Sequence, residues 1–84
     1  MKWTVVYHPA AENELIDLWL AAPDQADVTY AANLIERRLR RDPYTYSESR
    51  DDNSRIMIES PLAFGYDVSD DDCMVTVWSV WRIK

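Results

Sequence analysis

Cationic residues at the ends of predicted strands are the first candidates for chemistry in this sequence. Arg55 begins one β-rich stretch, and Arg82 and Lys84 end the last one, "VTVWSVWRIK" at 75–84. Guanidinium and ammonium groups can hold a phosphate or a carboxylate. Alternate side chains of a strand share a face. This period puts Arg82 and Lys84 with Thr76, Trp78 and Val80, and places Val75, Val77, Trp81 and Ile83 on the opposite face.

A sheet face that is open to solvent and carries cations and aromatic rings suits the docking of a nucleic acid or a protein. Arg50 belongs to this group of cations by its position shortly before Arg55. The alternative is that these charges only blunt the ends of the strands. The residues alone favour neither interpretation.

The densest basic stretch is "ERRLRR" at 36–41, which contains Arg37, Arg38, Arg40 and Arg41. Cations near the C-terminus of a helix interact favourably with the helix dipole, and this explains the stretch without a ligand. The other interpretation is a face that binds an anion or a partner protein.

Groups that could transfer a proton or bind a metal are few. His8 is the sole histidine and Cys73 the sole cysteine, so the sequence offers no spacing of zinc ligands. We expect His8 to cap or pack at a strand–helix junction, and Asp70, Asp71 and Asp72 to form a solvated turn. A chain with one glycine cannot build a phosphate-binding loop. We therefore expect no metal and no cofactor.

Composition points to one small domain, residues 1–84, with a net charge of −6 and 48% hydrophobic residues. The acidic balance argues against a general phosphate-binding surface, although apart from Lys2 every cation lies at residue 37 or later. No apolar run reaches the length of a membrane span. A single cysteine excludes an internal disulfide, and a reducing cytoplasm fits best.

Hydrophobic spacing predicts the first half of the fold. "KWTVVY" at 2–7 predicts a strand that ends at His8-Pro9. Ala11, Leu15, Leu18, Trp19 and Ala22 then form a helical stripe, which predicts a helix over about 10–22. A second stripe of Val28, Ala31, Ala32, Ile35 and Leu39 predicts a helix over about 25–41, with Asp24 as its N-cap. The short break forces a helical hairpin.

Residues 42–54 are polar and lack periodicity, so we expect a loop, with Tyr44 or Tyr46 as a tether. Three strands are predicted after it, at 55–59, 63–68 and 73–83, and their short turns favour an antiparallel meander. Gly65 inside a strand predicts a bulge or a close approach. The predicted fold is α+β, in the order β-α-α-β-β-β, with the helical hairpin packed on a mainly antiparallel sheet.

In this order the chain resembles the RelE/ParE toxin superfamily of bacterial type II toxin–antitoxin systems. "WTVVYHPAAENELIDLW" is similar to the family's opening strand and first helix, and "SRDDNSRIMIESPLAFGYDVSDDDCMVTVWSVWRIK" is similar to its closing meander. The resemblance covers nearly the whole chain. It implies a growth-inhibiting toxin whose partner is a cognate antitoxin.

The resemblance also implies candidate site residues. Nuclease members of the family cut messenger RNA on the ribosome with Lys, Arg, Glu, His and Tyr residues near the meander; matched here, the candidates are Arg55, Arg82 and Lys84. Ala63 stands where many members carry an arginine, and Arg82 cannot act as an acid or base near neutral pH. The ParE branch, which poisons DNA gyrase, lacks the nuclease residues.

We therefore expect a toxin that binds its target, with a gyrase-like target preferred. A ribosome-dependent mRNA endoribonuclease is the first alternative. The second is a non-toxic interaction domain, possible as a homodimer through exposed tryptophans. Arg37, Arg38, Arg40, Arg41 and Arg50 are the candidates for binding the antitoxin or another anion.

Overall fold

The computed structural model describes residues 2–50 and 53–83. Its elements follow the predicted order with one addition. They are β1 (Thr4–Tyr7), α1 (Pro9–Ala21), α2 (Gln25–Arg41), β2 (Ser47–Ser49), β3 (Ser54–Glu59), β4 (Leu62–Ser69) and β5 (Met74–Arg82). The predicted α+β class and its antiparallel meander are confirmed.

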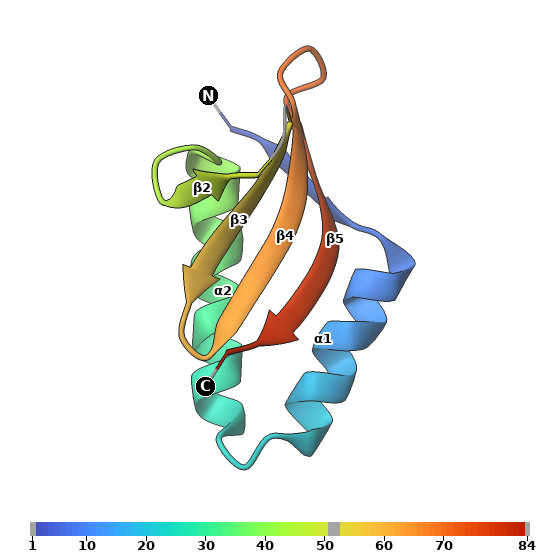
Figure 1. Cartoon of the computed structure of the whole chain (residues 1–84), viewed down its shortest axis with the longest axis vertical. Coiled ribbons are helices and arrows are strands. Elements are labelled where there is room, and N and C mark those ends of the chain that lie inside the picture. The colour runs from blue at the N-terminus through green and yellow to red at the C-terminus, as the bar shows by residue number, and fades with distance from the viewer. Residues whose placement is uncertain (1, 51–52, 84) are drawn as a thin grey trace.

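One five-stranded sheet has the order β1-β5-β4-β3-β2 (Figure 1). β1 pairs in parallel with β5, whereas the other neighbours are antiparallel. Because β1 has only four residues, it covers β5 from Met74 to Val77. Beyond that point α1 borders β5, and the Glu14 carboxylate accepts a hydrogen bond of 3.0 Å from the backbone N–H of Val80.

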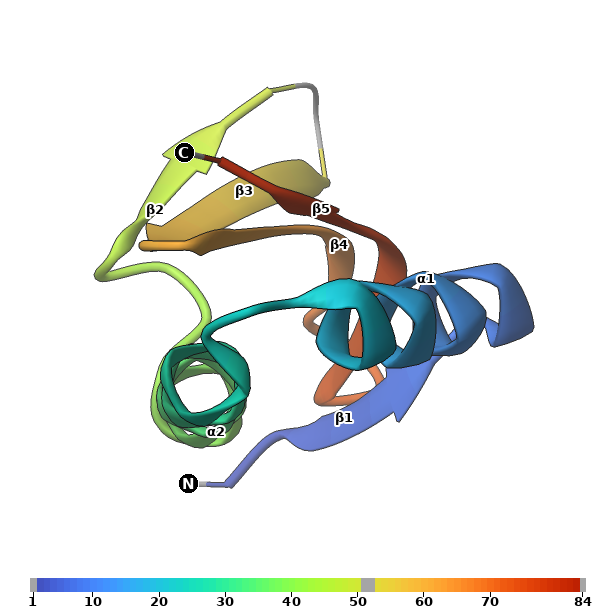
Figure 2. The same cartoon turned by 90° about the horizontal axis from the view of Figure 1, so that it is seen from below.

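Both helices lie on one side of β3, β4 and β5 (Figure 2). The predicted stripe of α2 is buried at Val28, Ala31, Ile35 and Leu39, and α1 contributes Ala11 with the half-buried Leu15 and Leu18. The residues of the sheet that are buried in this core are Met57, Leu62, Phe64, Tyr66, Val68, Val75, Val77 and Val80. This apolar layer holds the helical hairpin on the sheet and leaves the other sheet face without a helix.

One local prediction was wrong, and a second was confirmed in position only. Residues 42–54 are not all loop, since Ser47–Ser49 adds a short edge strand whose polar sequence gives no period-2 signal. Asp24 stands at the N-cap of α2 but its side chain makes no capping hydrogen bond. Its carboxylate is engaged by Arg82 instead.

A bulge in β5 overturns the predicted assignment of faces. Gly65 is opposite Ser79, but the next residue of β4, Tyr66, is opposite Val77, so Trp78 is an extra residue in β5. The strict period of two fails at this point. Val75, Val77 and Val80 are all buried, whereas Trp78 and Trp81 are exposed. Arg82 therefore shares a face with Val80 as predicted but not with Trp78, and Trp81 does not share the face of Val75 and Val77.

None of the helices in the described residues is long and apolar enough to cross a membrane.

Candidate functional site

The sheet face without helices carries a shallow hollow of about 320 Å³. Its floor comes from β3 and β4, at Ile56, Gly65 and Asp67, and its rim includes Arg50, Trp78 and Trp81. The two tryptophan side chains are 47% and 37% exposed. This exposure of large aromatic rings beside a cation makes the hollow a candidate docking surface.

Gly65 shapes this hollow. A Cβ atom added to Gly65 would lie 3.3 Å from Cζ3 of the Trp81 ring, closer than ordinary van der Waals contact. The absence of a side chain thus lets the ring lie against β4. Both consequences predicted for Gly65, a bulge and a close approach, are confirmed.

His8 has the structural role predicted for it. Its Nδ1 accepts a hydrogen bond of 3.1 Å from the backbone N–H of Ala10, which caps the start of α1. The imidazole also lies against Trp78, with ring centroids 4.6 Å apart. His8 therefore helps to hold one tryptophan of the hollow while its Nδ1 is committed to the helix.

Arg55 contributes to the lining of the hollow, but its guanidinium is bound by residues in and before β2. Nε donates a hydrogen bond of 2.7 Å to the Ser47 hydroxyl, and the guanidinium carbon lies 5.1 Å from the centroid of the Tyr44 ring. Tyr44 in turn donates to the Asp70 carboxylate at 2.6 Å, and this hydrogen bond raises the pKa of Tyr44 to about 12. Tyr44 thus acts as the predicted tether.

Arg82 is held at the other end of the sheet. Its two terminal nitrogens donate to the two carboxylate oxygens of Asp24 at 3.0 and 2.9 Å. These hydrogen bonds lower the pKa of Asp24 and raise the pKa of Arg82. A bidentate pair of this kind fixes the direction of the guanidinium as well as balancing its charge.

The structure does not bring Arg55 and Arg82 together. Arg55 is opposite Tyr66 and Arg82 is opposite Leu62, so they flank β4 from different sides and are offset by about 13 Å at the usual rise per residue. Lys84, the third predicted member, lies outside the described residues. The predicted catalytic residues therefore form no cluster in the part of the chain that the structure describes.

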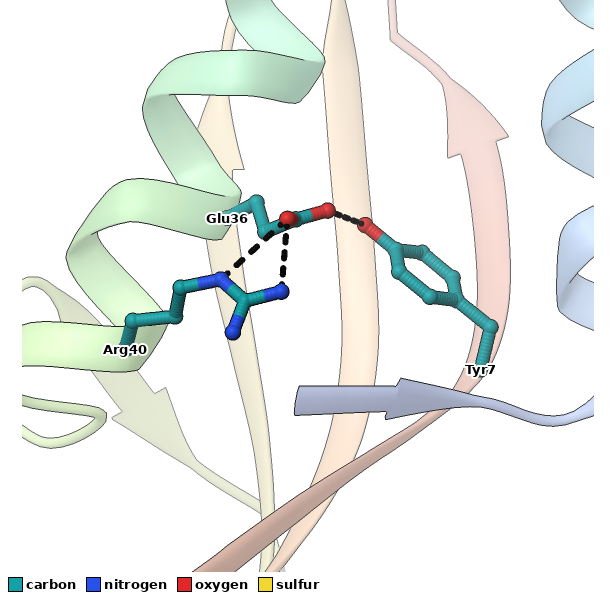
Figure 3. A network of polar contacts seen from close by, with 3 residues as sticks. All are labelled: Tyr7, Glu36 and Arg40. Atoms are coloured by element: carbon teal, nitrogen blue, oxygen red, sulfur yellow. Dashed lines mark hydrogen bonds and ion pairs between the residues drawn. The ribbon is translucent and has the colours of Figure 1, made fainter. Parts of the chain in front are cut away.

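Two of the four arginines near the end of α2 have internal acidic partners. Arg38 pairs with Glu59 of β3 at 3.0 Å and stacks over Tyr46. Arg40 donates to Glu36, whose second oxygen accepts a hydrogen bond of 2.8 Å from the Tyr7 hydroxyl (Figure 3). Burial of Tyr7, with this contact to Glu36, raises the pKa of Tyr7.

Arg37 and Arg41 differ from these. Both are exposed, and neither forms an ion pair within residues 2–50 and 53–83, where Arg50 and Lys2 are also without one. Arg37 and Arg41 line a groove together with Lys2 and Trp3, which precede β1. No local pattern predicts this contact, because the two segments lie far apart along the chain.

The described residues form two surfaces that differ in the cations they offer. The hollow offers aromatic surface and one cation without an ion pair, Arg50. The groove offers three such cations, Lys2, Arg37 and Arg41. Arg55 and Arg82 are hydrogen-bonded within the domain. No group of three or more metal-ligating side chains occurs among the residues that the structure describes.

Comparisons with known proteins place the fold. No protein-family model and no curated protein matches the sequence. Among solved structures, the toxin–antitoxin complex RelBE2 from Mycobacterium tuberculosis superposes with a TM-score of 0.80 and 14% identity, covering 98% of this chain and 99% of that one.

Two further structures agree. The isolated E. coli RelE toxin gives a TM-score of 0.62 at 19% identity, over 98% of this chain and 85% of that one. The chromosomal ParDE system from P. aeruginosa gives 0.66 at 12% identity, over 99% and 98%. The chain therefore has the fold of the RelE/ParE toxin superfamily, as the sequence resemblance predicts.

Proposed function

We propose that this protein is the toxin of a type II toxin–antitoxin module and that it inhibits growth by binding a cellular target. The support for the toxin role is the shared fold, since the similar structures are those of RelE, RelBE2 and ParDE proteins. Fold alone does not fix an activity, so the choice of mechanism rests on the side chains.

The observation that carries binding over cleavage is the engagement of Arg55 and Arg82. RNA cleavage through the ribose 2′-hydroxyl needs a base, an acid and cations directed at the phosphate. Arg55 is bonded to Ser47 and stacked on Tyr44, and Arg82 is bonded to Asp24 through both terminal nitrogens. Cations held in this way support a structural role, and they favour a gyrase-like protein target over messenger RNA.

The experiment is controlled induction of the protein in a bacterium without its antitoxin, inside the cytoplasm where we expect it to act. Growth arrest, inhibited supercoiling by purified gyrase and unchanged message ends are the expected results. Unimpaired growth would remove the toxin role and leave the non-toxic interaction domain, with sedimentation testing whether it is a homodimer.

Messenger RNA ends provide the test of mechanism. Primer extension that reveals new, codon-spaced 5′ ends after induction would replace binding by the ribosome-dependent nuclease. The hollow beside Arg50 would then be the first place to examine, since Trp78 and Trp81 could stack on bases. In that case Arg50→Gln, which changes a cation of the hollow and loses no ion pair in the described residues, should reduce cleavage.

A further inference from the structure

The unpaired cations of this chain are concentrated in one place. Within residues 2–50 and 53–83, the cationic side chains without an ion pair or hydrogen bond are Lys2, Arg37, Arg41 and Arg50. Three of them line a single groove of about 590 Å³, together with Trp3 and Arg40. We call this surface the basic groove: Lys2, Trp3, Arg37, Arg40 and Arg41.

Of the four cations of the basic groove, only Arg40 forms an ion pair within residues 2–50 and 53–83, with Glu36. Arg37 and Arg41 are one helical turn apart, a spacing at which like charges repel. Of the acids nearest in sequence, Glu36 binds Arg40 and Tyr7 (Figure 3). Asp42 lines a neighbouring hollow with Arg37 and Arg41 but forms no ion pair with either, and its carboxylate accepts hydrogen bonds from the Tyr44 backbone N–H and the Thr45 hydroxyl. The groove therefore keeps the electrostatic cost of its charges in the isolated protein.

The helix dipole accounts for only part of this arrangement. It favours cations in the last turn of α2, where Arg38, Arg40 and Arg41 lie. It does not account for Lys2, which precedes β1 and is held nearby because the Trp3 backbone N–H donates to the Arg40 carbonyl at 2.8 Å. The half-buried Trp3 ring adds an aromatic wall, packed edge-on against Tyr44.

We propose that the basic groove binds an acidic, extended segment of a partner protein. Carboxylates of that segment pair with Arg37, Arg41 and Lys2, and an apolar side chain between them packs on Trp3. A volume of about 590 Å³ accommodates a few side chains of a peptide. Arginine forks at exposed positions suit bidentate binding of carboxylates.

Charge favours a protein over a nucleic acid as the occupant. Binding to a nucleic acid draws its affinity from many phosphate contacts, and this groove offers three unpaired cations on a chain of net charge −6. A long polyanion would also be repelled by the net negative charge of the chain. A short acidic segment gains the local attraction with less of that repulsion.

The inference stands without the toxin role, because it depends only on the groove. If the partner is the antitoxin of the proposed module, the assignment of this surface to it rests on the proposed function. The two fail separately: absence of growth arrest would leave peptide binding intact, and absence of binding would leave growth arrest intact.

The test is fluorescence anisotropy of the full chain with a fluorescein-labelled peptide in which leucines are interspersed among glutamates. We expect saturable binding that weakens as salt is raised, because exposed charge pairs are screened. The double variant Arg37→Gln/Arg41→Gln should weaken binding by about tenfold or more, as loss of two charge-assisted contacts predicts. Arg50→Gln, which removes an unpaired cation outside the groove, should weaken binding much less than the double variant does, so that the loss is tied to the groove and not to net charge alone.

Two further probes decide the chemistry of the occupant. A peptide with serine in place of leucine should bind more weakly, since it cannot pack on Trp3. Oligouridylate that binds more tightly than the acidic peptide, with loss in the double variant, would make the groove a nucleic-acid site and overturn the proposal. Equal peptide binding by the wild type and the double variant, with circular dichroism unchanged, would overturn it as well.

Discussion

The guanidinium of Arg82, the last residue of β5, donates two hydrogen bonds to the carboxylate of Asp24, 58 residues earlier in the chain. Asp24 lies at the turn between α1 and α2. The pair therefore links the end of the sheet to the connection of the helical hairpin. This link makes Arg82 part of the structure of the domain, whatever else it contacts.

Breaking this pair should lower stability, and the effect should be mutual. We expect Arg82→Gln and Asp24→Asn each to lower the urea midpoint. The double variant should be no less stable than the less stable of the two single variants, because the effects of substitutions at two residues in contact do not add. Arg50→Gln, which loses no ion pair in the described residues, should not shift the midpoint. Additive effects of Arg82→Gln and Asp24→Asn would contradict the pairing.

Acid should remove the contribution of the Arg82–Asp24 pair to stability. The pKa of Asp24 is lowered in the folded state, so its contribution is present above the unfolded pKa of about 3.9 and is lost as pH falls through the folded value. Urea midpoints of the wild type should therefore fall more steeply below about pH 4 than those of Asp24→Asn. Parallel profiles would contradict this assignment.

The sequence predicted the elements of this fold well because their signals are local. Apolar residues at helical spacing marked α2, and Ser60-Pro61 marked the turn between β3 and β4. The Arg82–Asp24 pair had no such signal, since both residues have an ordinary local role as strand end and N-cap. β1 and the end of α2 likewise meet only through the tertiary fold, so the basic groove was missed.

The bulge shows how one residue changes a prediction about a site. Strict alternation assigned Trp81 to the face of Val75 and Val77, and the extra residue Trp78 reverses this for the rest of β5. Gly65 predicted a bulge in the sheet, but it did not predict that the bulge would move Trp81 to the other face. The position of the bulge in β5 depends on how β5 pairs with β4, and the local sequence does not encode this pairing.

Tyr66 should contribute to stability through its hydroxyl. The buried Tyr66 side chain donates a hydrogen bond of 2.5 Å to the carbonyl of Pro43, which ties the segment after α2 to the sheet. Tyr66→Phe leaves that carbonyl without this donor, so we expect a loss of about 1–2 kcal/mol in the free energy of unfolding. Tyr30→Phe, at a side chain 64% exposed, should change it by less than about 0.5 kcal/mol. Equal effects would contradict the role of the buried hydroxyl.

Tyr44 should ionise at unusually high pH. Its hydrogen bond to Asp70 favours the neutral phenol and raises the pKa to about 12. We expect Asp70→Ala to return the pKa toward about 10, measured by NMR of ring-labelled tyrosine with Tyr44→Phe for assignment. Because the unfolded phenol ionises first, the wild type should lose stability as pH rises from about 10 to 12. An unchanged pKa in Asp70→Ala would contradict the contact.

Gly65→Ala should separate the shape of the hollow from the stability of the fold. The added Cβ would lie 3.3 Å from Cζ3 of Trp81, whose ring is 37% exposed and can move outward. Alanine regains about 0.5–1 kcal/mol of backbone entropy relative to glycine, which offsets part of the crowding. We therefore expect a free energy of unfolding within about 1 kcal/mol of the wild type, together with a changed indole NMR signal of Trp81.

The same variant tests whether the hollow serves the proposed binding. If the target docks on this face, Gly65→Ala should reduce growth arrest on induction at equal protein level, because Trp81 no longer lies against β4. Ser79→Ala, a change opposite Gly65 that adds no atom beside the ring, is the matched control and should retain arrest. Full arrest by Gly65→Ala with a displaced Trp81 would show that the target binds elsewhere, and the basic groove would then be the next surface to alter.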